Sequence, residues 1–186
     1  VLGVITAVGG GAIRDIILGI TPPTMFRHSL YVFVAFLTSC VAFGLAAVMA
    51  VKFKKNKEFF MDVVNFFDAI GLGVFAVTGT NTAVVAGFSH NPFLAIFVGV
   101  ITGIGGGMLR DILAGRVPFV LYKDIYASAA IVGASLYYFL FINGVNAAVS
   151  VTSTIIITIL IRLAASFYHL SLPRIPKINI KDDDVE

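Results

Sequence analysis

The chain has 186 residues, of which 59% are hydrophobic and 12% are charged, whereas soluble globular domains have about 45–50% apolar and about 25% charged residues. This composition excludes an ordinary soluble domain, a disordered chain, a collagen, a coiled coil and a disulfide scaffold. The net charge is only +3, and the basic cluster at 52–57 lies between two apolar runs, so we expect no nucleic acid partner. Roughly 110 apolar residues, at about 20 per transmembrane helix, predict five to six membrane spans.

In chain order, hydropathy, charge runs and Pro/Gly punctuation divide the chain into six apolar segments. They are Val1–Gly19, Ser29–Val51, Asn65–Gly87, Pro92–Gly115, Tyr122–Ile142 and Asn146–Leu170. The first is the shortest, and the other five are long enough to span a bilayer. The segments lack the alternation of a membrane β-barrel, so the prediction is an all-α membrane protein. Residues 171–186, with two prolines and an acidic end, are predicted to form a flexible cytoplasmic tail.

The sequence contains a duplicated motif. Residues 3–22 read GVITAVGGGAIRDIILGITP, and residues 99–118 read GVITGIGGGMLRDILAGRVP. Twelve of the twenty aligned positions are identical at a constant offset of 96, so the similarity is an internal repeat rather than chance. Counted from one copy's span to the other's, the chain crosses the membrane three times, and an odd number reverses its direction. The two repeats are therefore predicted to be inverted, as in many transporters and channels.

Each repeat is expected to hold three helices, with the glycine motif on the middle one. The second copy follows the apolar segment Asn65–Gly87, whereas the first copy has no such segment before it. We therefore expect about 30 further residues, one helix and the start of the next, to precede Val1, which gives seven spans as three plus three plus one. The predicted units are a first repeat at 1–51, a second repeat at 62–142 and a seventh helix at 146–170.

Positive charge is concentrated on one predicted side of the membrane. Nine basic residues lie there: Lys52, Lys54, Lys55, Lys57, Arg116, Lys123, Arg174, Lys177 and Lys181. The opposite side has only Arg27. By the positive-inside rule the first side is cytoplasmic, so we expect a multi-pass protein of the plasma (cell inner) membrane with its C-terminus inside and membrane lipids around it.

Three consecutive glycines stand inside a predicted span in each copy. They are Gly9, Gly10 and Gly11 in the first copy and Gly105, Gly106 and Gly107 in the second. Glycine weakens a helix by about 1 kcal/mol per residue relative to alanine. The triplets therefore predict a kink or break near the midplane, with freed backbone groups facing the protein interior. The alternative is close packing of helices through small residues.

An Arg-Asp pair follows each triplet, first Arg14 and Asp15, then Arg110 and Asp111. Charges inside a membrane are candidates for function, and inversion places the two pairs at opposite mouths of one path. Adjacent residues on a helix point about 100° apart, so we expect each Arg to pair with another helix rather than with its own Asp. Asp68 is the nearest unassigned acid to Arg110, and we predict that the two approach one another as a latch or a gate. A purely structural pairing of helices is the alternative.

Hydroxyl and amide side chains are also expected near the midplane. They are Thr78, Thr80 and Asn81, which follow Asp68, and Thr6 and Thr102, which precede the triplets. Such groups suit a hydrated neutral path and, equally, hydrogen bonds between or within helices. Arg162 on the last segment is predicted to extend its side chain to the cytoplasmic interface.

No catalytic or metal-binding constellation is recognisable in the sequence. His28, His90 and His169 fall at the ends of predicted spans or in loops, and neither G-x-S-x-G nor H-E-x-x-H is present. We therefore expect neither an enzyme nor a bound metal or cofactor.

The doubled pattern G-V-I-T-x-x-G-G-G-x-x-R-D-I, with DAIGLGVFAVTG at 68–79 before the second copy, resembles the prokaryotic trimeric intracellular cation (TRIC) channels. This bacterial and archaeal family is also described as glycine-transporter-like. The resemblance covers nearly the whole chain. It implies a seven-helix, inverted-repeat protomer in a homotrimer, with a pore in each protomer for monovalent cations such as K⁺ and with the triplets kinking the second and fifth helices.

Two functional classes stay open at this point. A cation channel requires a continuous aqueous path lined by hydroxyls, amides and carbonyls. A transporter for a small neutral amino acid such as glycine requires an occluded site at the midplane, where a half-helix N-terminus after a triplet binds the carboxylate. A glycine-interrupted helix offers carbonyls and amides alike, so the residue pattern does not separate the two classes.

Overall fold

The structure is a computed structural model that describes residues 1–52, 57–121 and 124–168. Its long helices are α1 (Leu2–Ile17), α3 (Ser29–Lys52), α4 (Lys57–Ala83), α5 (Pro92–Leu113), α6 (Asp124–Ile142) and α7 (Ala147–Phe167). No strand occurs in these three ranges, and the predicted all-α fold is confirmed. The predicted tail at 171–186 and the topology charges at 54, 55, 123, 174, 177 and 181 lie outside the described residues.

Each predicted apolar segment corresponds to one long helix. The largest difference is at the start of α4, which begins at Lys57 rather than at Asn65. Hydropathy marks where a helix becomes apolar, whereas the backbone hydrogen bonds continue through the preceding charged turn. Three short elements are too short to carry a periodic signal and were not predicted as separate elements: α2 (Thr24–Arg27), the π-helical turn η1 (Val84–Phe88), which continues the apolar run of α4, and the 3₁₀ turn η2 (Phe119–Leu121).

Asparagine side chains begin two of the helices. Asn91 Oδ1 accepts a hydrogen bond from the Leu94 amide at 3.0 Å, and Pro92 occupies the first turn, where no amide hydrogen is needed. Asn146 Oδ1 accepts a hydrogen bond from the Ala148 amide at 2.9 Å. These caps place the starts of α5 and α7 where the sequence predicts them.

Glycine in the left-handed region ends three of the helices. The residues are Gly19, Gly115 and Gly144, with φ of 67°, 67° and 71°. After α1 the amide of Ile20 donates to the carbonyl of Asp15 at 2.8 Å, and after α5 the amide of Arg116 donates to the carbonyl of Asp111 at 2.9 Å. These are Schellman caps, and the two copies of the motif therefore end their helices with equivalent backbone bonds.

Four of the helices are long and apolar enough to cross a membrane within the described ranges. They are Val63–Phe88, Pro92–Leu113, Ile125–Ile142 and Ala147–Phe167, and Ser29–Leu45 is a shorter apolar helix. α1 has 16 residues, fewer than the about 20 that a typical span needs. Helices of this length and composition are those of a multi-pass membrane protein.

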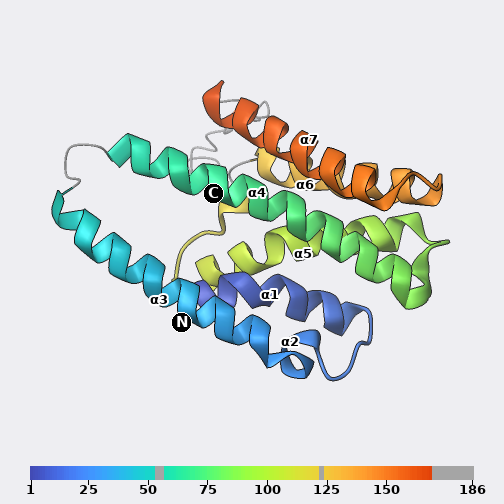
Figure 1. The fold of residues 1–186 in the computed structure, drawn as a ribbon, viewed down its shortest axis with the longest axis horizontal. Coiled ribbons are helices and arrows are strands. Elements are labelled where there is room, and N and C mark those ends of the chain that lie inside the picture. Colours follow the sequence, from blue (N-terminus) through green and yellow to red (C-terminus); the bar gives the residue numbers. More distant parts are fainter. Residues whose placement is uncertain (53–56, 122–123, 169–186) are drawn as a thin grey trace, which may run out of the picture.

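The helices pack around α5, which contacts α1, α4 and α6 (Figure 1). α7 packs against α4 and α6, whereas the described part of α3 contacts only α1 and α2 along the outside of the bundle (Figure 1). Small residues permit the closest approaches, because a Cβ at Gly99 would overlap the Thr80 hydroxyl of α4. The tight α4–α5 contact holds the polar groups of both helices in fixed positions.

Candidate functional site

The two glycine triplets meet where α1 and α5 cross. The two helices run in opposite directions (Figure 1). Gly9 and Gly10 lie against Gly106. A Cβ added at Gly10 would overlap the carbonyl oxygen of Thr102, and a Cβ added at Gly106 would overlap the carbonyl oxygen of Thr6. The two contacts are equivalent under the offset of 96. The crossing is therefore reciprocal, because each copy of the motif presents the same surface to the other.

Both helices continue through their triplets. α1 is helical over Leu2–Ile17 and α5 over Pro92–Leu113. The predicted break is therefore wrong, and a kink without a break stays a prediction. Close packing, the alternative, accounts for the middle glycines, since only a residue without a side chain allows the two backbones to approach this closely.

The third glycine of each triplet has different surroundings. A Cβ at Gly11 would lie 3.7 Å from Arg14 Nη2, and a Cβ at Gly107 would lie 3.9 Å from Arg110 Nη2. Neither distance is a clash, and both glycines line a cavity. Each triplet thus combines a packing contact with a stretch of cavity wall.

The first cavity, of about 170 Å³, lies between α1, α4, α5 and α6. Its polar wall is made by Thr6, Gly10, Gly11, Asp68, Thr102, Gly107 and Tyr126. Thr6 donates to the carbonyl of Leu2 at 2.8 Å and Thr102 donates to that of Val98 at 2.6 Å, so both hydroxyl oxygens keep acceptor capacity. The cavity has room for several water molecules and polar groups to bind them.

A second cavity, of about 140 Å³, adjoins the first. It is lined by residues of α4, α5 and α6 and by η2, and it includes Arg110 and Asp111. The two cavities share Asp68, Gly107 and Tyr126 in their walls. Asp68 therefore stands at the boundary between the two spaces.

Asp68 is held by residues of two other helices. Arg162 Nη2 of α7 lies 3.2 Å from Asp68 Oδ2, and the Tyr126 hydroxyl of α6 donates to Asp68 Oδ1 at 3.3 Å. The Arg162 guanidinium carbon lies 4.4 Å from the centre of the Tyr126 ring, a cation–π contact. The Asp68 side chain is 36% exposed, whereas that of Arg162 is 7% exposed.

This cluster bears on two sequence-based predictions. Arg162 does not extend its side chain into water, as was predicted, but is buried against Asp68, because a carboxylate in the bundle stabilises its charge better than apolar surroundings do. The ion pair of Asp68 is with Arg162, while Asp68 and Arg110 line the same cavity, and their approach as a latch or a gate stays a prediction. Sequence reasoning missed Tyr126. A signal for the buried face of α7 exists in the four-residue spacing of its buried polar residues, Ser150, Thr154, Thr158 and Arg162.

The prediction that each arginine of the Arg-Asp pairs forms its ion pair with another helix rather than with its own Asp is wrong. Arg14 Nε donates to Asp15 Oδ1 at 2.8 Å, and Arg110 Nε donates to Asp111 Oδ1 at 2.8 Å. The 100° angle separates the Cβ directions of the two adjacent residues, but the arginine side chain is long enough to bend back to the neighbouring carboxylate. The ion pair of each arginine therefore lies within its own helix, and Arg14 Nη2 also donates to the Thr24 hydroxyl of α2 at 3.5 Å.

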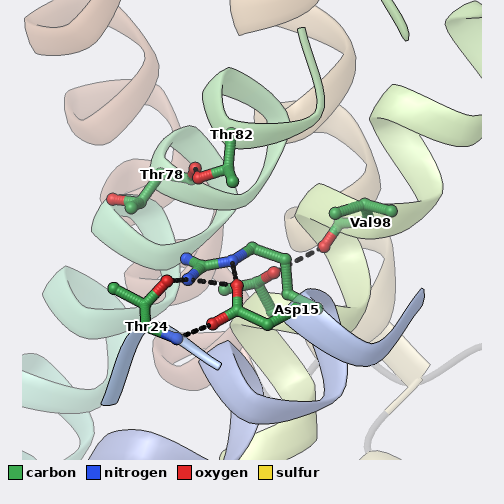
Figure 2. A network of polar contacts seen from close by, with 7 residues as sticks. Asp15, Thr24, Thr78, Thr82 and Val98 are labelled. Atoms are coloured by element: carbon green, nitrogen blue, oxygen red, sulfur yellow. Dashed lines mark hydrogen bonds and ion pairs between the residues drawn. The ribbon is translucent and has the colours of Figure 1, made fainter. Parts of the chain in front are cut away.

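The second oxygen of each carboxylate binds the start of the next short helix. Asp15 Oδ2 accepts from the Thr24 amide at 2.6 Å, and Asp111 Oδ2 accepts from the Phe119 amide at 2.9 Å. Figure 2 shows the Thr24 nitrogen pointing at the Asp15 carboxylate. A carboxylate at a helix start satisfies a free amide and favours the helix dipole. Both pairs thus fasten the loop that follows their helix.

The remaining predicted polar residues lie away from the two cavities described above. Thr78 of α4 and the buried Thr80 each donate to the carbonyl four residues earlier, as does Thr82, which was not predicted; Thr78 and Thr82 are drawn in Figure 2. Asn81 Oδ1 accepts from the Tyr137 hydroxyl at 2.9 Å. The structure therefore brings Thr6 and Thr102 together at the first cavity, but not Thr78, Thr80 or Asn81.

Comparisons with known proteins agree with this arrangement. A family model described as "Glycine transporter" matches residues 1–47 and 65–141. A UPF0126 membrane protein of Vibrio cholerae is 36% identical over 93% of this chain and 69% of its own length. The UPF0126 inner membrane protein YadS of Escherichia coli K12 is 39% identical over 93% of this chain and 80% of its own length.

Solved structures share the fold. A TRIC cation channel, solved for the structural basis of its conductance, superposes with a TM-score of 0.79 at 35% identity, over 92% of this chain and 80% of that one. The trimeric intracellular cation channel orthologue from Rhodobacter sphaeroides superposes with a TM-score of 0.77 at 32% identity, over 89% of this chain and 80% of that one.

Proposed function

The chain belongs to the TRIC-like membrane protein family described as glycine transporters, and from this membership we propose that it is a channel for monovalent cations. Members of the family are channels or transporters, and the chain is accordingly a multi-pass membrane transport protein rather than an enzyme. The proposal is that cations pass between α1, α4, α5 and α6, through the two cavities that share Asp68.

One observation supports this path most strongly. Asp68 is an acidic side chain, 36% exposed, at the boundary of two adjoining cavities. An acidic group on a hydrated wall raises the local concentration of cations and disfavours anions. Threonine hydroxyls and glycine backbone on the wall of the first cavity add neutral polar groups, which can replace part of a cation's hydration shell, and apolar side chains such as Phe67, Leu72 and Phe75 line the rest.

The finer features of the proposal come from the relatives and from the charge distribution. The cation is K⁺, the protein is a homotrimer with one path in each protomer, and α1 and α5 kink at their triplets. The C-terminus is cytoplasmic in the inner membrane, with lipids around the bundle. The relatives described as an inner membrane protein and as a trimeric channel support the location and the assembly, and the sequence charges support the orientation.

Recording from the purified protein in planar bilayers tests the proposal. Under a K⁺ gradient we expect unitary currents whose reversal potential follows the K⁺ equilibrium potential. The reversal potential under a Na⁺ gradient then gives the relative permeability of the two cations. Asp68→Asn is expected to lower the unitary conductance and shift the reversal potential away from the cation value. Absence of unitary currents, together with saturable glycine uptake into liposomes, would overturn the proposal.

Glycine transport is the second candidate, because the family model carries that description. A transported glycine needs donors for its carboxylate, and the expected donor is a free helix N-terminus after a triplet. The helices are continuous through Gly9–Gly11 and Gly105–Gly107 and expose no such N-terminus there. This geometry favours the channel.

A further inference from the structure

The carboxylate of Asp68 is reached from two sides. It lines both cavities, whereas Arg162 lines neither and approaches from α7. A cation in either cavity and the guanidinium of Arg162 therefore compete for one carboxylate.

Few other interactions hold Arg162 within the described part of the chain. There its guanidinium makes one ion pair, with Asp68, and lies against the face of the Tyr126 ring. Its Nε atom is buried and has no hydrogen-bond partner among the residues that the structure describes. The arginine is thus a tethered cation whose position is determined by Asp68 and the aromatic ring.

The other charged groups near Asp68 do not add negative charge to the boundary. Arg110 lines the second cavity, where Asp111 neutralises it at 2.8 Å. Asp68 and Arg162 also sum to zero, so the wall offers an incoming ion a carboxylate whose attraction is already reduced by a neighbouring positive charge.

We propose that Arg162 is a specificity-determining residue that keeps Asp68 from trapping divalent cations. Conduction requires binding that is favourable enough for entry and weak enough for exit. An unpaired carboxylate in these partly buried surroundings attracts a divalent cation about twice as strongly as a monovalent one, and Ca²⁺ in particular prefers carboxylate oxygen ligands. With Arg162 in place, monovalent cations pass along the path and Ca²⁺ does not stay bound at Asp68. The conductance part of this inference rests on the proposed function, whereas the ion-binding part does not.

The test compares Ca²⁺ block of K⁺ currents among variants of the full chain. In Arg162→Gln the half-blocking Ca²⁺ concentration is expected to fall about tenfold, which corresponds to about 1.4 kcal/mol tighter binding. The double variant Asp68→Asn/Arg162→Gln should lose this tight block, and Arg162→Lys should stay close to the wild type because it keeps the charge. Arg27→Gln, which removes an exposed arginine in α2, is the matched control and should not change the block.

A second readout does not depend on current. Ca²⁺ should raise the unfolding temperature of detergent-solubilised Arg162→Gln more than that of the wild type, and not that of the double variant. This result without wild-type currents would leave the inference standing while the channel proposal fails. Wild-type currents with unchanged block and unchanged Ca²⁺ stabilisation in Arg162→Gln would overturn the inference alone.

Folding of the variants is checked by size-exclusion chromatography. If Arg162→Gln does not fold, Arg162→Met, which has an apolar side chain of similar length, replaces it with the same expected Ca²⁺ binding. If neither variant folds, Asp68→Asn is the deciding variant, because it leaves the positive charge of Arg162 beside the path without its carboxylate partner. K⁺ conductance is then expected to fall several-fold, and an unchanged conductance would overturn the proposal.

Discussion

The two Arg-Asp pairs make equivalent bonds in different surroundings. In α1 the side chains of Arg14 and Asp15 are 9% and 1% exposed, whereas in α5 those of Arg110 and Asp111 are 39% and 12% exposed. Both carboxylates bind their neighbouring arginine and the amide of a following short helix. The bonding is thus a property of the repeated sequence, and the burial is a property of what the rest of the chain packs against each copy.

This difference in burial indicates that the Arg-Asp pair of the first copy has a structural role, whereas the pair of the second copy also faces the cavities. Arg110 and Asp111 line the second cavity, next to Asp68, whereas Arg14 and Asp15 line neither of the two cavities of the site. An ion pair that is closed off from water holds a loop in place, while a half-exposed one also contributes charge to an aqueous space. Duplicated motifs need not have duplicated roles.

The largest expected effect comes from neutralising the buried acid. Asp15→Asn leaves the buried Arg14 without its counter-charge, and we expect a loss of about 3–5 kcal/mol of folding stability. Asp111→Asn removes the same bonds from a wetter site and should cost about 1–3 kcal/mol. Thermal unfolding in detergent measures both losses. Equal losses would show that the difference in burial has no energetic consequence.

A smaller effect, and an equal one in both copies, is expected at the helix crossing. Gly10→Ala and Gly106→Ala each place a Cβ on a backbone carbonyl of the other helix, and each should cost about 1–3 kcal/mol by forcing the helices apart. Gly11→Ala and Gly107→Ala are the matched controls, because the new Cβ would lie 3.7 Å from Arg14 Nη2 and 3.9 Å from Arg110 Nη2, without a clash. Unequal costs at Gly10 and Gly106 would contradict the reciprocity of the crossing.

The smallest effect is expected at the threonines before the triplets. Thr102 is 2% exposed and Thr6 is half-buried, although both line the first cavity. Thr102→Val should cost about 0.6 kcal/mol, the average for a polar contact inside a membrane protein, and Thr6→Val should cost less. Chemical denaturation in detergent resolves the order of the two variants. A larger cost at Thr6 would contradict the observed burial.

Much of the fold could be predicted from the sequence, because a bilayer requires long apolar helices and their ends carry local signals. Pro92 and Gly115 mark the bounds of α5 closely. The short helices α2 and η2 could not be predicted, since four and three residues carry no periodicity.

The candidate site was predicted only in part. Thr6 and Thr102 were expected on a polar path and Asp68 near Arg110; the threonines and Asp68 line the first cavity, and Asp68 and Arg110 line the second. The partners of Asp68 were not predicted, because hydropathy averages over all faces of a helix and hides which face is buried. Arg162 could have been placed only by following the buried polar face of α7 and then knowing what packs against it.

The reciprocal crossing of α1 and α5 has a consequence for how the two copies can diverge. The contacts of Gly10 with Thr102 and of Gly106 with Thr6 are those of an isologous interface, in which one surface binds a second copy of itself. In a homodimer of separate chains, every substitution in such a surface would occur twice. Here both halves are in one polypeptide, so a change in one half leaves the other intact. Because the two copies are covalently linked, the Arg14–Asp15 pair can stay buried while the Arg110–Asp111 pair is partly exposed to water.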